Sequence, residues 1–137
     1  MSSESQHMAG VLIAVLPTVV FGGVSILYLW LGVNSDYMKN PLRQSLWRAG
    51  HAHAGVLLVV SLVALLYVDS AALSDDLKWL VRNTIPLAAI FLPAAFFLSV
   101  LKPDATKPNV LINLAYVGAV LLVTGLLTLG IGLINAA

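Results

Sequence analysis

The chain has 137 residues, of which 60% are hydrophobic and 9% are charged, and its mean hydropathy is +0.97. Soluble domains of this size carry far more charge, so the composition excludes that class and predicts an integral membrane protein. The absence of cysteine excludes disulfides and thiolate metal sites. With a net charge of +1, the sequence gives no reason to expect a nucleic-acid partner.

Four apolar segments predict transmembrane helices, because about 20 apolar residues in helical form cross the hydrocarbon core of a bilayer. They are residues 8–33, 46–68, 85–101 and 109–134. Tyr28 and Trp30 would close the first span as interfacial aromatic residues. We therefore expect an all-α, four-transmembrane-helix bundle that forms a single integral membrane domain over residues 1–137.

Residues 69–83, between the second and third spans, have a different pattern. Ser74 is a favourable helix N-cap, and Asp75 and Asp76 would lie in the first turn, where the helix dipole favours acids. An apolar stripe follows them. The pattern predicts a short helix between spans two and three that either lies at the interface or leads into the third span. Pro86 would restart or bend the chain there, since proline suits the first turn of a helix.

The distribution of Lys and Arg predicts the orientation, because short cytoplasmic loops are enriched in these residues. The first and third loops have Lys39, Arg43, Arg48, Lys102 and Lys107, whereas the second loop has only Lys78 and Arg82. Both termini should therefore lie on the non-cytoplasmic side. We expect the protein in the inner (plasma) membrane of a bacterium.

Two histidines lie near the start of the second span, in the stretch WRAGHAHAG at 47–55. Ionisable side chains at membrane depth are costly, so they indicate a functional site. His51 and His53 are two residues apart and point to opposite sides of a helix, which argues against one metal ion bound by both. We expect His51, on the same face as Arg48, to face the bundle interior, and His53 to face an adjoining subunit or lipid headgroups. The alternative is that both rings only fix helix packing.

A His-x-His on a membrane helix resembles the arrangement with which haem-copper oxidases ligate two haems from opposite faces of one span. The resemblance covers residues 51–53, and the other histidine ligands of that family have no counterpart here. It implies haem as a candidate cofactor. Because the two rings point apart, a six-coordinate haem would take its second imidazole from another protomer or a partner protein.

Polar residues on the fourth span, Asn109, Asn113 and Tyr116, share one helical face. In the predicted orientation they lie at the same depth as His51 and as Tyr28. We therefore predict a polar ligand-binding pocket in the cytoplasmic leaflet, made by Tyr28, Arg48, His51, Asn109, Asn113 and Tyr116. The alternative is an interhelical hydrogen-bond network that fixes packing only.

Gly118, Gly125 and Gly132 recur every seven residues on another face of the fourth span. Small residues at this spacing make a smooth seam where a second helix can approach closely. We expect packing within the bundle, with homodimerisation as the alternative.

The sequence is compatible with three functions. The first is a small non-catalytic subunit or homo-oligomer that binds a haem, a metal or a lipid-like ligand through the histidine region. The second is a structural or assembly subunit of a larger membrane complex. The third is a membrane enzyme with His51 or His53 as general base. A carboxylate-driven proton antiporter is disfavoured, because no Asp or Glu falls within the four spans.

Overall fold

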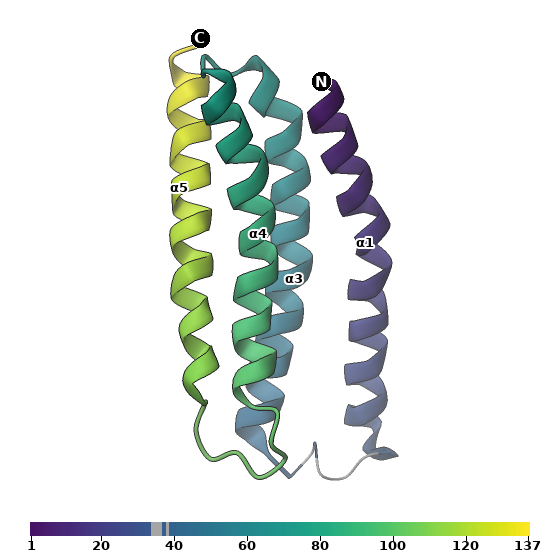
Figure 1. Ribbon diagram of the computed structural model, residues 1–137. Helices are drawn as coiled ribbons and strands as arrows, with labels where there is room; N and C mark the ends of the chain where they lie inside the picture. Colours follow the sequence, from purple (N-terminus) through teal and green to yellow (C-terminus); the bar gives the residue numbers. More distant parts are fainter. Residues whose placement is uncertain (34–36, 38) are drawn as a thin grey trace.

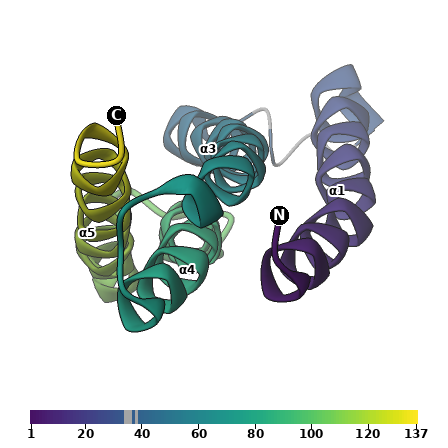
Figure 2. The same cartoon turned by 90° about the horizontal axis from the view of Figure 1, so that it is seen from above.

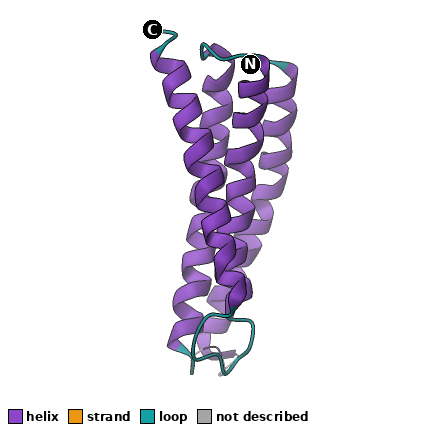
Figure 3. Cartoon of the chain, turned by 60° about the vertical axis from the view of Figure 1, so that its left-hand side comes forward, coloured by secondary structure: helices purple, strands orange, loops and turns teal. Residues whose placement is uncertain are grey.

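The structure is a computed structural model that describes residues 1–33, 37 and 39–137, and its regular elements are helices (Figure 3). In chain order they are α1 (Ser3–Tyr28), the π-helical turn η1 (Leu29–Val33), α3 (Pro41–Tyr67), the 3-10 turn η2 (Val68–Ser70), α4 (Asp75–Ser99), the 3-10 turn η3 (Val110–Asn113) and α5 (Leu114–Ile134). Four of the helical stretches are long and apolar enough to cross a membrane. This confirms the all-α class and the presence of four helices that could span a membrane.

The helices are not arranged as a closed ring. α4 packs along both α3 and α5, whereas α1 leans on α3 and has little contact with α4. Viewed from above, α1 and α5 lie on opposite sides of the α3–α4 pair (Figure 2). Both termini lie at the same end of the molecule, and α1 and α4 end at the other (Figure 1).

The segment predicted as a short interfacial helix is not a separate element. Ser74 caps a helix, as expected, by accepting a hydrogen bond from the Leu77 amide at 3.4 Å. That helix is α4, which continues through Pro86 and Pro93 to Ser99. Proline removes one backbone donor but does not end this helix, because a buried apolar face on both sides of Pro86 packs against α3 and α5.

The glycine seam of α5 faces α4. A Cβ atom placed on Gly125 would lie 2.5 Å from Cγ1 of Ile85, and one on Gly118 would lie 2.7 Å from Cγ of Leu92. Gly132 is equally close to Leu73. All three glycines are buried, so the seam serves packing within the chain, the first of the two predicted interpretations.

A group of polar residues, the polar latch (Ser2, Ser5, Asp69 and Arg82), fixes the first turn of α1. Asp69 accepts hydrogen bonds from the Ser2 amide at 2.6 Å and from the Arg82 guanidinium, also at 2.6 Å. Arg82 in turn donates to the hydroxyl of Ser5 at 2.9 Å, and Ser5 is fully buried. The latch joins the start of α1 to the corner between α3 and α4.

At the opposite end, α3 begins five residues earlier than its predicted boundary at 46. Asn40 accepts a hydrogen bond from the Arg43 amide at 3.1 Å and also donates to the carbonyl of Pro103 at 2.8 Å. Arg43 donates to the carbonyls of Val100 and Leu101 at 3.1 and 3.2 Å. The start of α3 is therefore fixed to the chain that follows α4.

Candidate functional site

His51 packs directly against two glycines of α1. A Cβ atom on Gly23 would lie 2.9 Å from Nε2 of His51, and one on Gly22 would lie 3.7 Å from Nδ1. The ring is half-buried, and neither nitrogen has a hydrogen-bond partner in the part of the chain that the structure describes. His51 thus points into the contact between α1 and α3, and the bare backbone of α1 makes room for its ring.

His53 points elsewhere. Its side chain is exposed, its Nδ1 lies 2.7 Å from the Ala49 carbonyl oxygen, and its ring centroid lies 5.0 Å from that of Phe96. The predicted divergence of the two rings is therefore present in the structure. Among the described residues, no group of three or more His, Cys, Asp or Glu side chains comes close enough to hold a metal ion.

A groove of about 290 Å³ lies beside His51, where α1 ends. We call it the Arg48 groove; its lining residues are Gly23, Ile26, Leu27, Trp30, Tyr37 and Arg48. Arg48 is exposed and donates to the Gln44 carbonyl at 3.2 Å and to the Gln44 amide oxygen at 3.5 Å. Its guanidinium therefore runs back along its own helix toward the loops, as expected for a cationic side chain that extends to a membrane surface.

Two aromatic side chains behind the groove carry buried donors. Tyr37 is 1% exposed, and its ring lies 5.7 Å from that of Trp47. The Tyr37 hydroxyl and the Trp47 indole nitrogen are both buried without a hydrogen-bond partner among the described residues. Burial raises the pKa of Tyr37, so its phenol stays protonated and remains a donor.

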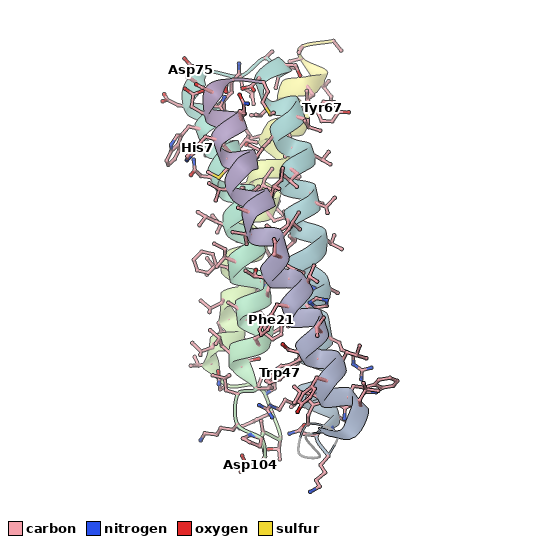
Figure 4. The ribbon with its side chains drawn as sticks, turned by 90° about the vertical axis from the view of Figure 1, so that its right-hand side faces the viewer. His7, Phe21, Trp47, Tyr67, Asp75 and Asp104 are labelled. Atoms are coloured by element: carbon pink, nitrogen blue, oxygen red, sulfur yellow. The ribbon has the colours of Figure 1, made fainter. Side chains whose placement is uncertain are left out.

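The end of the molecule that holds the groove is cationic. Trp47 and Asp104 lie at this end, and His7 and Asp75 lie at the other (Figure 4). The guanidinium of Arg43 lies 4.3 Å from the Trp47 ring centre, which is a cation–π contact. Lys102 and Lys107 are exposed in the loop that follows α4. A negatively charged group near the groove would meet this positive field.

The six-residue pocket predicted from depth is not formed, because its members lie on separated surfaces. Tyr28 is 56% exposed on α1 and Tyr116 is 74% exposed on α5, which lies across the molecule from α1 (Figure 2). Asn113 is exposed as well, and Asn109 caps η3 through the Leu111 amide at 2.8 Å. The predicted polar stripe is not continuous, because Asn109 and Asn113 belong to the cap and the end of η3. Tyr116 faces outward on α5 because the glycine face of that helix packs against α4. Arg48 and His51 are the only two of the six that lie at the α1–α3 contact.

Sequence reasoning missed the partners of these two residues. Nothing in the sequence indicates that Gly22 and Gly23 pack against a histidine side chain. Tyr37 and Trp47 flank the basic residues of the first loop, and that combination of aromatic and basic residues is the one signal that pointed to them.

No protein-family model, curated protein or solved structure matches the chain at a significant level.

Proposed function

We propose that the protein is a small non-catalytic membrane subunit or homo-oligomer that binds a lipid-like ligand in the Arg48 groove. The observation that carries the proposal is the composition of the groove: Ile26, Leu27 and Trp30 make an apolar wall, and Arg48 is the one charged group among the described residues that line it. An amphiphile with an apolar chain and a polar head fits such a site. Because the groove lies beside His51, the proposal retains the predicted role of the histidine region in ligand binding.

A bare metal ion fits these residues less well than an amphiphile. A metal ion in a protein usually takes three or four side-chain ligands. His51 and His53 point apart, and within the described ranges no group of three or more His, Cys, Asp or Glu side chains could hold a metal ion. A lipid-like ligand needs only an apolar surface and one or two polar contacts.

The same proposal includes an orientation in the membrane. Both termini lie on the non-cytoplasmic side of a bacterial inner membrane, so the Arg48 groove opens at the cytoplasmic surface and the first turns of α4 lie at the outer interface. The excess of Lys and Arg in the first and third loops supports it. Single cysteines at Ser3 and Thr106, labelled with an impermeant maleimide in intact cells, should react only at Ser3; labelling at Thr106 alone would reverse the orientation.

The ligand is tested by what remains bound after purification. Native mass spectrometry of the 14.5 kDa chain released from mild detergent should show adducts of lipid mass. Leu27→Trp fills the groove and should reduce the adducts. Val24→Trp is the matched control, because Val24 is 59% exposed on α1 and does not line the groove. No adduct in the wild-type protein, or equal adducts in both variants, would reject the proposal in favour of a structural or assembly subunit.

A second candidate, haem, is supported by the hydrogen bond of His53. A carbonyl oxygen can only accept, so Nδ1 of His53 carries the proton in its bond to Ala49. Nε2 is then the nitrogen with a free lone pair, on an exposed side chain. A second copy of the chain would supply the other axial imidazole. Haemin titrated into the purified protein should give a Soret shift that His53→Ala abolishes and His51→Ala leaves intact; a titration without a shift rejects this candidate.

A further inference from the structure

The residues at the Arg48 groove restrict the charge and the hydrogen-bonding chemistry of the head group that the proposed lipid-like ligand can have. Among the described residues, the polar groups that line the Arg48 groove can all donate: the guanidinium of Arg48, the hydroxyl of Tyr37 and the indole of Trp30, with the indole of Trp47 behind Tyr37. No carboxylate from the described residues lines the groove. Resting on the proposed function, we infer that the ligand is an anionic phospholipid whose phosphate is bound by Arg48 and Tyr37.

The unpartnered donors are the main argument. A buried hydroxyl or indole N–H without an acceptor is unfavourable, and native structures leave few of them. Tyr37 is such a donor and also lines the groove. Its raised pKa keeps the proton in place. A phosphate oxygen that reaches this buried hydroxyl from the groove would supply the missing acceptor. Zwitterionic phospholipids have the same phosphate, but their choline or ammonium group also brings a positive charge close to Arg48.

Charge at this end of the molecule supports the same assignment. Arg43 is already engaged with the Val100 and Leu101 carbonyls and with the Trp47 ring, so it supports the aromatic wall. Among the described residues, Arg48 donates to Gln44 of its own helix, and a guanidinium has further donors for a ligand. Lys102 and Lys107 add positive charge at the same end, where Asp104 adds one negative charge. The field repels a cationic head group and attracts an anionic one.

Quenching of tryptophan fluorescence by brominated lipids tests the inference. The protein is placed in bilayers that contain brominated phosphatidylglycerol or brominated phosphatidylcholine. Trp79→Phe serves as background, because Trp79 lies on α4 near its start, away from the groove. Trp30 and Trp47 should then be quenched with an apparent affinity about fivefold higher for phosphatidylglycerol.

The variants separate the site from general charge. Arg48→Gln and Tyr37→Phe should bring the preference close to one. Lys107→Ala removes the same charge from the same end but lies outside the groove, and should keep most of the preference. Circular dichroism of each variant verifies folding, and Tyr37→Phe, which removes only the hydroxyl, keeps the test available if Arg48→Gln does not fold.

These experiments separate a failure of the anionic-phospholipid inference from a failure of the proposed lipid binding itself. Equal quenching by the two lipids, with lipid adducts that Leu27→Trp still reduces, overturns the phosphate assignment and leaves lipid binding in place. A preference that excess inorganic phosphate abolishes shows that the site takes free phosphate, which overturns the lipid assignment. A wild-type chain without lipid adducts and without preferential quenching overturns both proposals.

Discussion

The two outer helices, α1 and α5, use their glycines in different ways. On α5, Gly118 and Gly125 face α4 and Gly132 faces Leu73 just before it, so α5 approaches its neighbours closely along its length. On α1, Gly22 and Gly23 face a single side chain, His51, and much of the helix remains exposed. α1 is held by the polar latch at one end, by apolar side chains around Leu12 that pack against α3, and by His51 near the other end. The difference supports the proposal that α1 covers a ligand site, whereas α5 serves stability.

Gly125→Leu should have the largest effect, because it breaks the α5 contact. The new side chain would overlap Ile85 and Thr84, both within 2.5 Å of the Cβ position. We expect a loss of about 3 kcal/mol in the free energy of unfolding. Gly130→Leu is the control, since nothing lies within 4 Å of its Cβ position. Thermal unfolding in detergent measures both, and equal melting temperatures would contradict the packing described for α5.

Asp69→Ala should have the next largest effect, because it opens the polar latch. Arg82 would lose a charge-assisted hydrogen bond of 2.6 Å while its side chain stays only 12% exposed. We expect a loss of about 2 kcal/mol and faster proteolysis near the start of α1. Asp76→Ala removes an exposed acid at the same end and should cost only about 0.5 kcal/mol, from its interaction with the α4 dipole, without faster proteolysis near the start of α1. A latch variant as stable as this control would mean that α1 is held by its contact with α3 alone.

The sequence predicted the four spans but not the way their faces point. Long apolar runs are sufficient to identify transmembrane helices, and a spacing of two residues is sufficient to separate His51 from His53. Periodicity groups Asn109, Asn113 and Tyr116 on one face, but the direction of that face depends on which face of α5 packs better. The glycine seam packs better, so the polar face turned outward. For a similar reason, the sequence did not predict that α4 continues through Pro86. The tertiary packing of α4 outweighs the local preference of proline for the first turn of a helix.

His51→Ala tests whether α1 covers a site. Loss of the ring leaves Gly22 and Gly23 without their contact, and we expect a cost of about 1 kcal/mol together with fewer lipid adducts. The oligomeric state should not change. His53→Ala should do the reverse, with adducts retained and any oligomer weakened. If both variants lose stability alike and keep the same adducts, the histidines are packing residues.

Arg48→Lys should have the smallest effect, below about 0.5 kcal/mol, because its contacts lie within one turn of its own helix. A lysine stem also reaches the membrane surface and keeps the charge. Lipid preference and melting temperature should both stay close to the wild-type values. A large loss in either would reveal a bidentate partner that only a guanidinium satisfies.

The polar latch has a consequence for biosynthesis. Asp69 and Arg82 follow Ser5 by 64 and 77 residues, so α1 is made well before the residues that fix it. During synthesis the first turn of α1 is therefore fixed only after the corner between α3 and α4 has been made. The Arg48 groove forms when α1 packs on α3. A lipid that lies between these two helices at that moment would occupy the groove from the start, and the opening of the groove leaves a path for later exchange.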